Sequence, residues 1–176
     1  MREWMRGVAM ALAVATVAAC HVEPPDPNAP RELTKDVSVS GQITVANVKA
    51  LRDKGFKTIV NMRPDSEAPD QSKYKQLQSA AQDAGLGYGY IPVKQGAAIP
   101  GTAAEALNTV LRRMPKPILV FSDTPAPPAR TWALAEASRA DGLDATSILA
   151  AVKAAGQPAD DLAKQIDARI AARPKH

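Results

Sequence analysis

The chain has 176 residues, 45% of them hydrophobic, and a net charge of +4 at pH 7, which is typical of a single globular domain. Its basic residues form no run longer than two and do not alternate with aromatic residues, so the charge does not indicate a nucleic-acid binder. Both histidines, His21 and His176, and the single cysteine, Cys20, lie in the terminal segments, which excludes a histidine base, a disulfide and a cysteine or histidine metal site from the folded body.

The first twenty residues resemble the signal peptide of a bacterial lipoprotein. Arg2 and Arg6 precede an apolar stretch over 7–18, and the sequence Val17-Ala18-Ala19-Cys20 resembles a lipobox. The apolar stretch is too short for a spanning helix, which takes ~20 residues. The resemblance implies cleavage before Cys20, diacylglycerol on its sulfur and an acyl chain such as palmitate on its amino group, which together anchor a protein stably. The alternative is an ordinary signal peptide with an incidental cysteine.

The residues after Cys20 bear on location. An Asp at the next position retains lipoproteins of the Gram-negative type in the inner membrane, and here the residue is His21. The resemblance therefore implies the periplasmic face of the outer membrane, with the inner membrane as the alternative. Prolines predict a semi-stiff, extended tether over 21–36 that holds the domain off the membrane.

From Val37 onwards the sequence alternates short strands with amphipathic helices. Strands are predicted at 37–40, 58–62, 88–93 and 117–121, and the last is apolar throughout, which indicates a central strand covered on both faces. This alternation predicts an α/β fold with a mainly parallel sheet over 37–156, followed by a C-terminal helix and tail over 157–176. Trp132 is expected in the core, and Asp144 is expected to cap a helix. The helices are expected at about 45–55, 74–85, 103–114, 129–140, 145–155 and 159–172.

Four motifs occur in the order that one family shows. They are Val39-Ser40-Gly41-Gln42-Ile43-Thr44, Asn61-Met62-Arg63-Pro64-Asp65-Ser66-Glu67, Tyr90-Ile91-Pro92-Val93 and Trp132-Ala133-Leu134-Ala135. Over about residues 35–156 the chain resembles the beta-lactamase hydrolase-like, protein-tyrosine-phosphatase-like domain, whose loop is also rhodanese-like. The resemblance implies a phosphatase-like three-layer fold with a sheet of four or five strands flanked by helices.

The loop after the strand at 117–121 is where such a domain carries its catalytic groups. The family's loop reads like Cys-Arg-Ser-Gly-Thr-Arg, whereas here it is Ser122-Asp123-Thr124-Pro125-Ala126-Pro127-Pro128. By the resemblance, Ser122 stands at the cysteine position, Pro125 at the glycine position and Pro127 at the arginine position. All three catalytic features are replaced.

The chemistry of the loop leads to the same interpretation. A thiolate loop needs an ionised nucleophile, backbone N–H donors around the anion and an arginine fork. Ser122 is un-ionised, the domain offers it no histidine base, the prolines remove backbone donors, and Asp123 adds negative charge. We interpret the segment as an ordinary strand–loop–helix connection in which Pro128 begins the helix.

Two alternatives stay open at this loop. In one, Ser122 is an atypical nucleophile with Asp123 or Asp65 as its base. In the other, Thr124 and Arg130 form a residual anion site, although Arg130 comes two or three residues later than the arginine of the family's loop.

A second group of polar residues follows the strand at 58–62. In an active relative Asp65 would act as an acid or organise the loop, but here we interpret Arg63 and Asp65 as a structural pair. Asp65, Glu67 and Asp70 form an acidic loop without the glycine spacing of a calcium site, so no metal is predicted. The loop over 94–101 contains no Asp or Glu that could serve as a general acid.

These observations predict a lipoprotein with a catalytically inactive phosphatase-like domain, a pseudoenzyme that acts as an interaction or scaffold module at the envelope. The membrane is its partner through the lipid on Cys20, and an envelope protein is a second expected partner. No cofactor and no nucleic acid are predicted. The alternatives are a phosphoester hydrolase of the dual-specificity type with an atypical nucleophile, and a small-anion binding protein.

Overall fold

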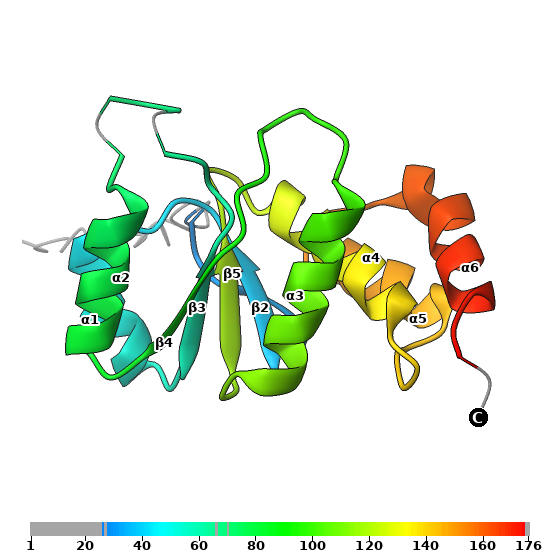
Figure 1. Cartoon of the computed structure of the whole chain (residues 1–176), viewed down its shortest axis with the longest axis horizontal. Helices are drawn as coiled ribbons and strands as arrows, with labels where there is room; N and C mark the ends of the chain where they lie inside the picture. The colour runs from blue at the N-terminus through cyan, green and yellow to red at the C-terminus, as the bar shows by residue number, and fades with distance from the viewer. Residues whose placement is uncertain (1–25, 27, 66, 70, 175–176) are drawn as a thin grey trace, which may run out of the picture.

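The sheet is the centre of the computed structural model, which describes residues 26, 28–65, 67–69 and 71–174. Its five strands lie in the order β1-β2-β5-β3-β4, and β1 is antiparallel to β2 while the other neighbours are parallel (Figure 1). The predicted α/β class with a mainly parallel sheet is confirmed. The strands are β1 (Arg31–Thr34), β2 (Val37–Ser40), β3 (Thr58–Asn61), β4 (Gly87–Tyr90) and β5 (Ile118–Phe121).

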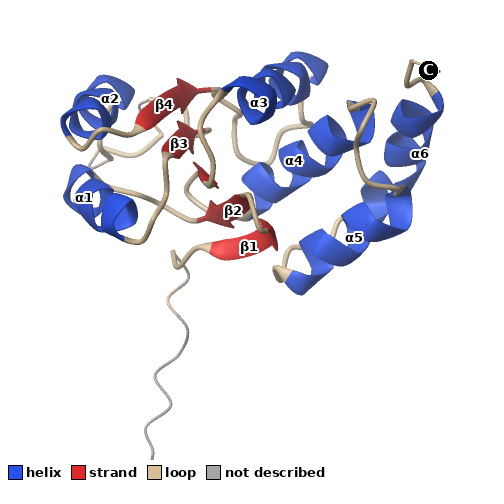
Figure 2. Cartoon of the chain, turned by 90° about the horizontal axis from the view of Figure 1, so that it is seen from below, coloured by secondary structure: helices blue, strands red, loops and turns tan. Residues whose placement is uncertain are grey.

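Helices cover both faces of the sheet. Figure 2 shows α1 (Val45–Asp53) and α2 (Tyr74–Asp83) on one side and α3 (Gly101–Arg113) and α4 (Ala126–Ser138) on the other. A third set packs on the outer side of α4 and consists of α5 (Ala145–Ala154), a 3₁₀ turn (Asp160–Leu162) and α6 (Ala163–Ala171). Among the described residues, no helix is long and apolar enough to cross a bilayer.

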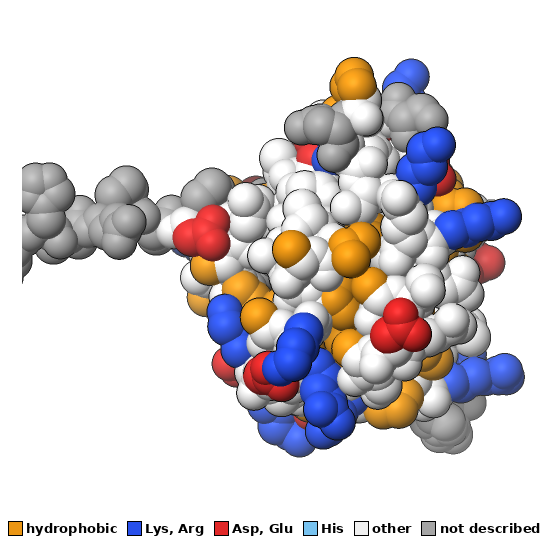
Figure 3. All heavy atoms as spheres, turned by 90° about the vertical axis from the view of Figure 1, so that its left-hand side faces the viewer, with side chains coloured by type: hydrophobic (Ala, Val, Ile, Leu, Met, Phe, Trp, Pro, Cys, Tyr) orange, Lys and Arg blue, Asp and Glu red, His pale blue; other side chains and the backbone are white. Residues whose placement is uncertain are grey.

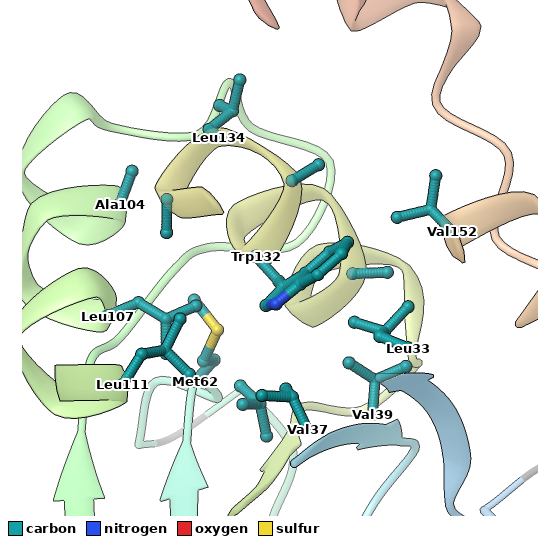
Figure 4. Close-up of a cluster of buried hydrophobic side chains, with 14 of the residues drawn as sticks. Leu33, Val37, Val39, Met62, Ala104, Leu107, Leu111, Trp132, Leu134 and Val152 are labelled. Carbon is teal, nitrogen blue, oxygen red and sulfur yellow. The ribbon is translucent and has the colours of Figure 1, made fainter. Parts of the chain in front are cut away.

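Strand β5 joins the two halves of the core. All four of its side chains are fully buried: Ile118 and Val120 face the cluster under α3 and α4, and Leu119 and Phe121 face the cluster under α1 and α2. The prediction of a central strand covered on both faces is therefore confirmed. Trp132 of α4 is also fully buried, as predicted, and Figure 4 shows it among side chains of the sheet, α3 and α5.

The structure differs from several predicted boundaries. The strand predicted at 88–93 ends at Tyr90. Residues Arg31–Thr34, which the prediction assigned to the tether over 21–36, form β1, because Leu33 packs into the core and the backbone pairs with β2. Helix α4 begins at Ala126 rather than near 129, since prolines are accommodated in a first helical turn. The helix predicted over 159–172 is divided into the 3₁₀ turn and α6.

The N-terminal predictions concern residues that the structure does not describe. The lipobox, Cys20 and His21 all lie outside the described residues, so the predicted lipid anchor is addressed only by the sequence. Asp144 caps α5 as predicted, since its carboxylate accepts the backbone N–H of Ser147 at 2.9 Å.

Candidate functional site

The candidate site lies where the parallel strands end, the edge at which open α/β sheets bind ligands. Ser122 follows β5 directly and is only 1% exposed. Its hydroxyl donates to Asp123 Oδ1 across 3.4 Å, which is long for an O–H···O hydrogen bond, and its N–H donates to the Ser40 carbonyl at 3.5 Å. The geometry thus leaves Ser122 buried and poorly coupled to its one neighbouring carboxylate.

The first turn of α4 is depleted in backbone donors. An α-helix leaves its first four N–H groups free, and these are the groups that hold an anion. Here Pro125 is the cap and Pro127 and Pro128 are the second and third helical residues, so only the N–H of Ala126 remains. The next donor, Ala129, is already bonded to the Pro125 carbonyl at 3.1 Å. Three of the first four positions of this helix therefore lack the amide hydrogen with which a helix terminus binds an anion.

Arg130 is held by a carboxylate distant in the sequence. Its guanidinium makes a bidentate ion pair with Asp161 of the 3₁₀ turn, with N–O distances of 2.9 and 2.5 Å. The hydrogen bonds raise the pKa of Arg130 and lower that of Asp161. A bidentate pair uses two N–H groups of the guanidinium, so the Asp161 carboxylate already takes the donors that an anion would need from Arg130. This pairing was not predicted, because Asp161 is 31 residues away from Arg130 in the sequence.

Thr124 and Arg130 do line a common pocket, of about 380 Å³, between the loop after β4 and the start of α4. Lys94 contributes a second cation, and Ile99 and Pro127 contribute apolar walls. A different pocket, of about 580 Å³, lies between α1 and α2, where Figure 3 shows apolar side chains beside basic ones. None of the predicted site residues lines it.

Arg63 and Asp65 do not form the predicted pair. Arg63 makes an ion pair with Glu67 at 3.3 Å and donates to the Gln42 side chain, so it joins the loops after β2 and β3. Asp65 instead accepts the N–H of Tyr74 at 2.8 Å, at the start of α2. The prediction of a structural role fits these contacts, but the predicted partner was wrong, because the loop brings Glu67 rather than Asp65 within reach of Arg63.

Tyrosine side chains contact the loop that follows β3. The Tyr90 hydroxyl accepts the N–H of Asp65 at 3.2 Å, and the rings of Tyr74 and Tyr90 stack with centroids 4.5 Å apart. The Tyr88 hydroxyl accepts the Asn61 amide at 3.2 Å, and burial raises the pKa of Tyr88 to about 12. Tyr88 is therefore protonated at neutral pH, and through these contacts the tyrosines support the loop structurally.

The acidic loop forms no metal centre in the described part of the chain. Among the described residues, no three His, Cys, Asp or Glu side chains come close enough together to hold a metal ion. Asp70, the third member of the predicted acidic loop, lies outside the described residues.

Comparisons with known proteins agree with this architecture. The model of the family described as beta-lactamase hydrolase-like protein, phosphatase-like domain, matches residues 30–140. A beta-lactamase hydrolase-like protein of Agrobacterium fabrum is 43% identical over 61 residues, which is 35% of this chain and 14% of that protein. One of Xylella fastidiosa is 28% identical over 105 residues, or 60% of this chain and 24% of that protein. The chain therefore spans no more than a quarter of these relatives.

Solved structures show the same fold at low identity. A candidate phosphatase from Neisseria meningitidis superposes with a TM-score of 0.66 at 24% identity, over 79% of this chain and 96% of its own. A candidate phosphatase from Shewanella putrefaciens gives a TM-score of 0.61 at 17% identity, over 81% and 93%. A kinase-associated phosphatase whose catalytic cysteine is substituted by serine gives 0.61 at 14%, over 86% and 100%. The family match extends over most of the described sheet and helices, and the chain belongs to the beta-lactamase hydrolase-like protein, phosphatase-like domain family.

Proposed function

We propose that this chain is a lipid-anchored periplasmic protein whose phosphatase-like domain does not catalyse phosphoryl transfer and serves as an interaction module at the envelope. One observation carries the catalytic part of the proposal. Pro125 is the cap of α4 and Pro127 and Pro128 are its second and third residues, so three of the first four positions of this turn lack an N–H. Removing one oxyanion donor from an enzyme costs about 10²–10³-fold in rate, and here three positions lack one.

The other catalytic parts give independent support. Ser122 has its nearest acceptor, Asp123, at 3.4 Å, beyond the distance at which a general base takes a proton efficiently. Arg130 is engaged by Asp161. The loop that follows β4 presents Lys94 and Gln95 and contains no carboxylate to protonate a leaving group. The geometry of Ser122, the ion pair of Arg130 and the composition of this loop therefore support the proposal together.

The location in the proposal rests on the N-terminal sequence. The lipobox-like run that ends in Cys20 supports an anchor of at least two acyl chains, which holds a protein on a bilayer stably. His21 after the cysteine supports the outer membrane over the inner membrane. The interaction role is proposed because the chain retains the phosphatase-like fold without the family's catalytic residues.

Turnover is the direct test of inactivity. The chain from His21 to His176 is assayed with a chromogenic phosphomonoester, alongside Ser122→Ala and, as a matched control, Ser138→Ala. Ser138 lies at the far end of α4 and contacts the Leu134 carbonyl. We expect no hydrolysis above buffer for any of the three proteins. Hydrolysis that is lost in Ser122→Ala and kept in Ser138→Ala would establish a serine nucleophile and overturn the proposal.

The interaction role is tested in cells with a photo-crosslinking amino acid at Gln95, on the candidate site edge, or at Lys57, on the opposite edge. Both side chains are exposed. One envelope adduct formed reproducibly from Gln95 and absent from Lys57 supports a partner at this edge. Adducts that are the same from both positions, or absent from both, contradict it.

A second candidate function is anion binding without turnover. The pocket that contains Lys94, Thr124 and Arg130 favours it, because two cations and a hydroxyl converge there. Titration of the soluble domain with phosphate, sulfate and vanadate, followed by amide shifts in NMR, decides the question. Saturable shifts confined to 122–130 would establish the anion site. Unchanged shifts in that loop would remove both this candidate and the hydrolase.

A further inference from the structure

The N-terminal segment joins the fold at the same edge of the sheet as the candidate site. Strand β1 is antiparallel to β2, and its first residue, Arg31, pairs with Val39 near the carboxyl end of β2. Strands β2 and β5 are parallel, and Ser40 pairs with Phe121. The residues that precede β1 therefore lie beside the loop that follows β5.

Close contacts fix this position. Gly41 lies between the N-terminal segment and the site loop: a Cβ added there would lie 2.3 Å from Asn28 Oδ1 and 3.3 Å from the Asp123 carbonyl oxygen. The segment is itself folded, since Asn28 and Ala29 both donate backbone N–H groups to Asp26, at 2.8 and 3.0 Å. The described chain thus enters the fold at Asp26, next to the candidate site.

The remaining connection is short. Six residue steps separate Cys20 from Asp26, and extended chain reaches at most ~3.6 Å per residue, or roughly 22 Å. A domain of this size has a radius of gyration of about 15 Å and measures roughly 40 Å across. The connection is therefore shorter than the domain is wide.

We propose that the anchor holds the carboxyl-end edge of the sheet toward the lipid headgroup layer, so that the candidate site faces the membrane and Asp26 lies no more than roughly 22 Å from the anchored Cys20. This inference rests on the lipid anchor of the proposed function. The opposite edge, where Lys57 and Lys116 precede β3 and β5, is then directed away from the bilayer. The surface that the site meets is the headgroup layer.

The charges on the edge do not provide this orientation. Lys73 and Lys94 are exposed there, but so is Asp26, while Asp65 and Asp123 add partly exposed negative charge. An edge of mixed sign is not drawn strongly to an anionic bilayer. The orientation is therefore set by the length and the attachment point of the connection, and it is independent of salt.

The geometry can be measured without cellular lipidation, because Cys20 is the only cysteine. The described fold begins at Asp26, so a chain from Cys20 to His176 retains all of it. This chain is coupled through Cys20 to phosphatidylcholine vesicles that carry a maleimide lipid. A dye attached to a non-natural amino acid at Gln95 or at Lys57 reports energy transfer to an acceptor on the headgroups.

The two dye positions form a matched pair. Gln95 follows β4 and Lys57 precedes the neighbouring strand β3. The two residues therefore lie at opposite ends of adjacent parallel strands. Strand rise places them roughly 15–20 Å apart along the strand direction. We expect stronger transfer from Gln95 than from Lys57, unchanged by salt. A flexible Gly/Ser insertion before Asp26 that is longer than the domain is expected to abolish the difference.

Equal transfer from the two positions in the uninserted chain, or stronger transfer from Lys57, would overturn the orientation. Native Cys20 is examined separately by mass spectrometry of its peptide from cell membranes. An unmodified cysteine there would overturn the anchoring on which the inference rests, even if the vesicle geometry agreed. The two failures are therefore distinguished by different measurements.

Discussion

Arg173 is expected to be a main stabilising contact of α4, the helix that begins at the candidate site. Its guanidinium donates to four backbone carbonyls at the other end of that helix and in the following loop. Nε bonds Ala137 at 2.9 Å, Nη1 bonds Gly142 at 3.0 Å, and Nη2 bonds Glu136 at 2.9 Å and Leu143 at 2.8 Å. The positive charge also lies at the negative end of the α4 dipole.

Substitution by methionine removes all four bonds and keeps an unbranched, apolar side chain. A hydrogen bond to a charged group contributes about 1.5–3 kcal/mol. The four are not additive, because water can solvate the carbonyls that are partly exposed. We expect Arg173→Met to lower the free energy of unfolding by about 2–4 kcal/mol, and with ~2–4 °C per kcal/mol for a chain of this length the Tm falls by roughly 5–15 °C.

Urea unfolding followed by circular dichroism measures this loss, with Arg112→Met as the control. Arg112 is an exposed arginine of α3 and is expected to change stability by less than ~0.5 kcal/mol. Arg173→Lys keeps the charge but cannot reach all four carbonyls, so it should recover only a small part of the loss. A loss in Arg173→Met no larger than that of the control would refute the reasoning.

Three further predictions concern single groups. Burial raises the pKa of Tyr88 to about 12 from an ordinary value of 10, so the folded state holds the proton more tightly and the free energy of unfolding should fall as pH rises from 10 toward 12. This fall should be smaller in Tyr88→Phe, and an identical pH profile would contradict the assignment. Asn108 has a buried side-chain oxygen with no partner in the described part of the chain, so Asn108→Ala should leave stability unchanged or raise it by up to ~1 kcal/mol in thermal unfolding; a loss above ~1 kcal/mol would count against this. Asp161→Asn releases Arg130 and should tighten phosphate binding a few-fold in the NMR titration, at a cost of at most ~1 kcal/mol in stability, because the pair is partly exposed. Shifts no larger than in the unsubstituted chain would show that the pair does not control the site.

Local pattern was sufficient to predict much of the sheet. The uninterrupted apolar run of β5 indicated its central place, and both of its faces are covered because alternate side chains pack into the two core clusters. Strand β1 escaped prediction, since Arg31-Glu32-Leu33-Thr34 offers a single apolar residue and has no periodicity of its own. Only pairing with β2 makes it a strand.

The depletion of backbone donors at the start of α4 could also be predicted from local residues. A proline removes its own N–H wherever it stands, so the depletion at Pro125, Pro127 and Pro128 does not depend on the rest of the fold. The structure shows that the helix begins at Ala126, so these prolines lie at the cap and in the first turn, where free N–H groups would otherwise be.

The sequence by itself determined the α/β class, the order of the strands and helices from β2 to α5, and the absence of a cysteine from the loop after β5, since all three follow from composition and spacing within short segments. Tertiary structure alone decided which partners the charged groups take. Arg130 is bound by Asp161, and Arg173 caps α4. It also placed Asn28 beside Gly41, and with it the entry of the chain at the site edge. Such contacts depend on which surfaces the fold brings together. The sequence around each residue does not indicate a partner that lies far away in the chain.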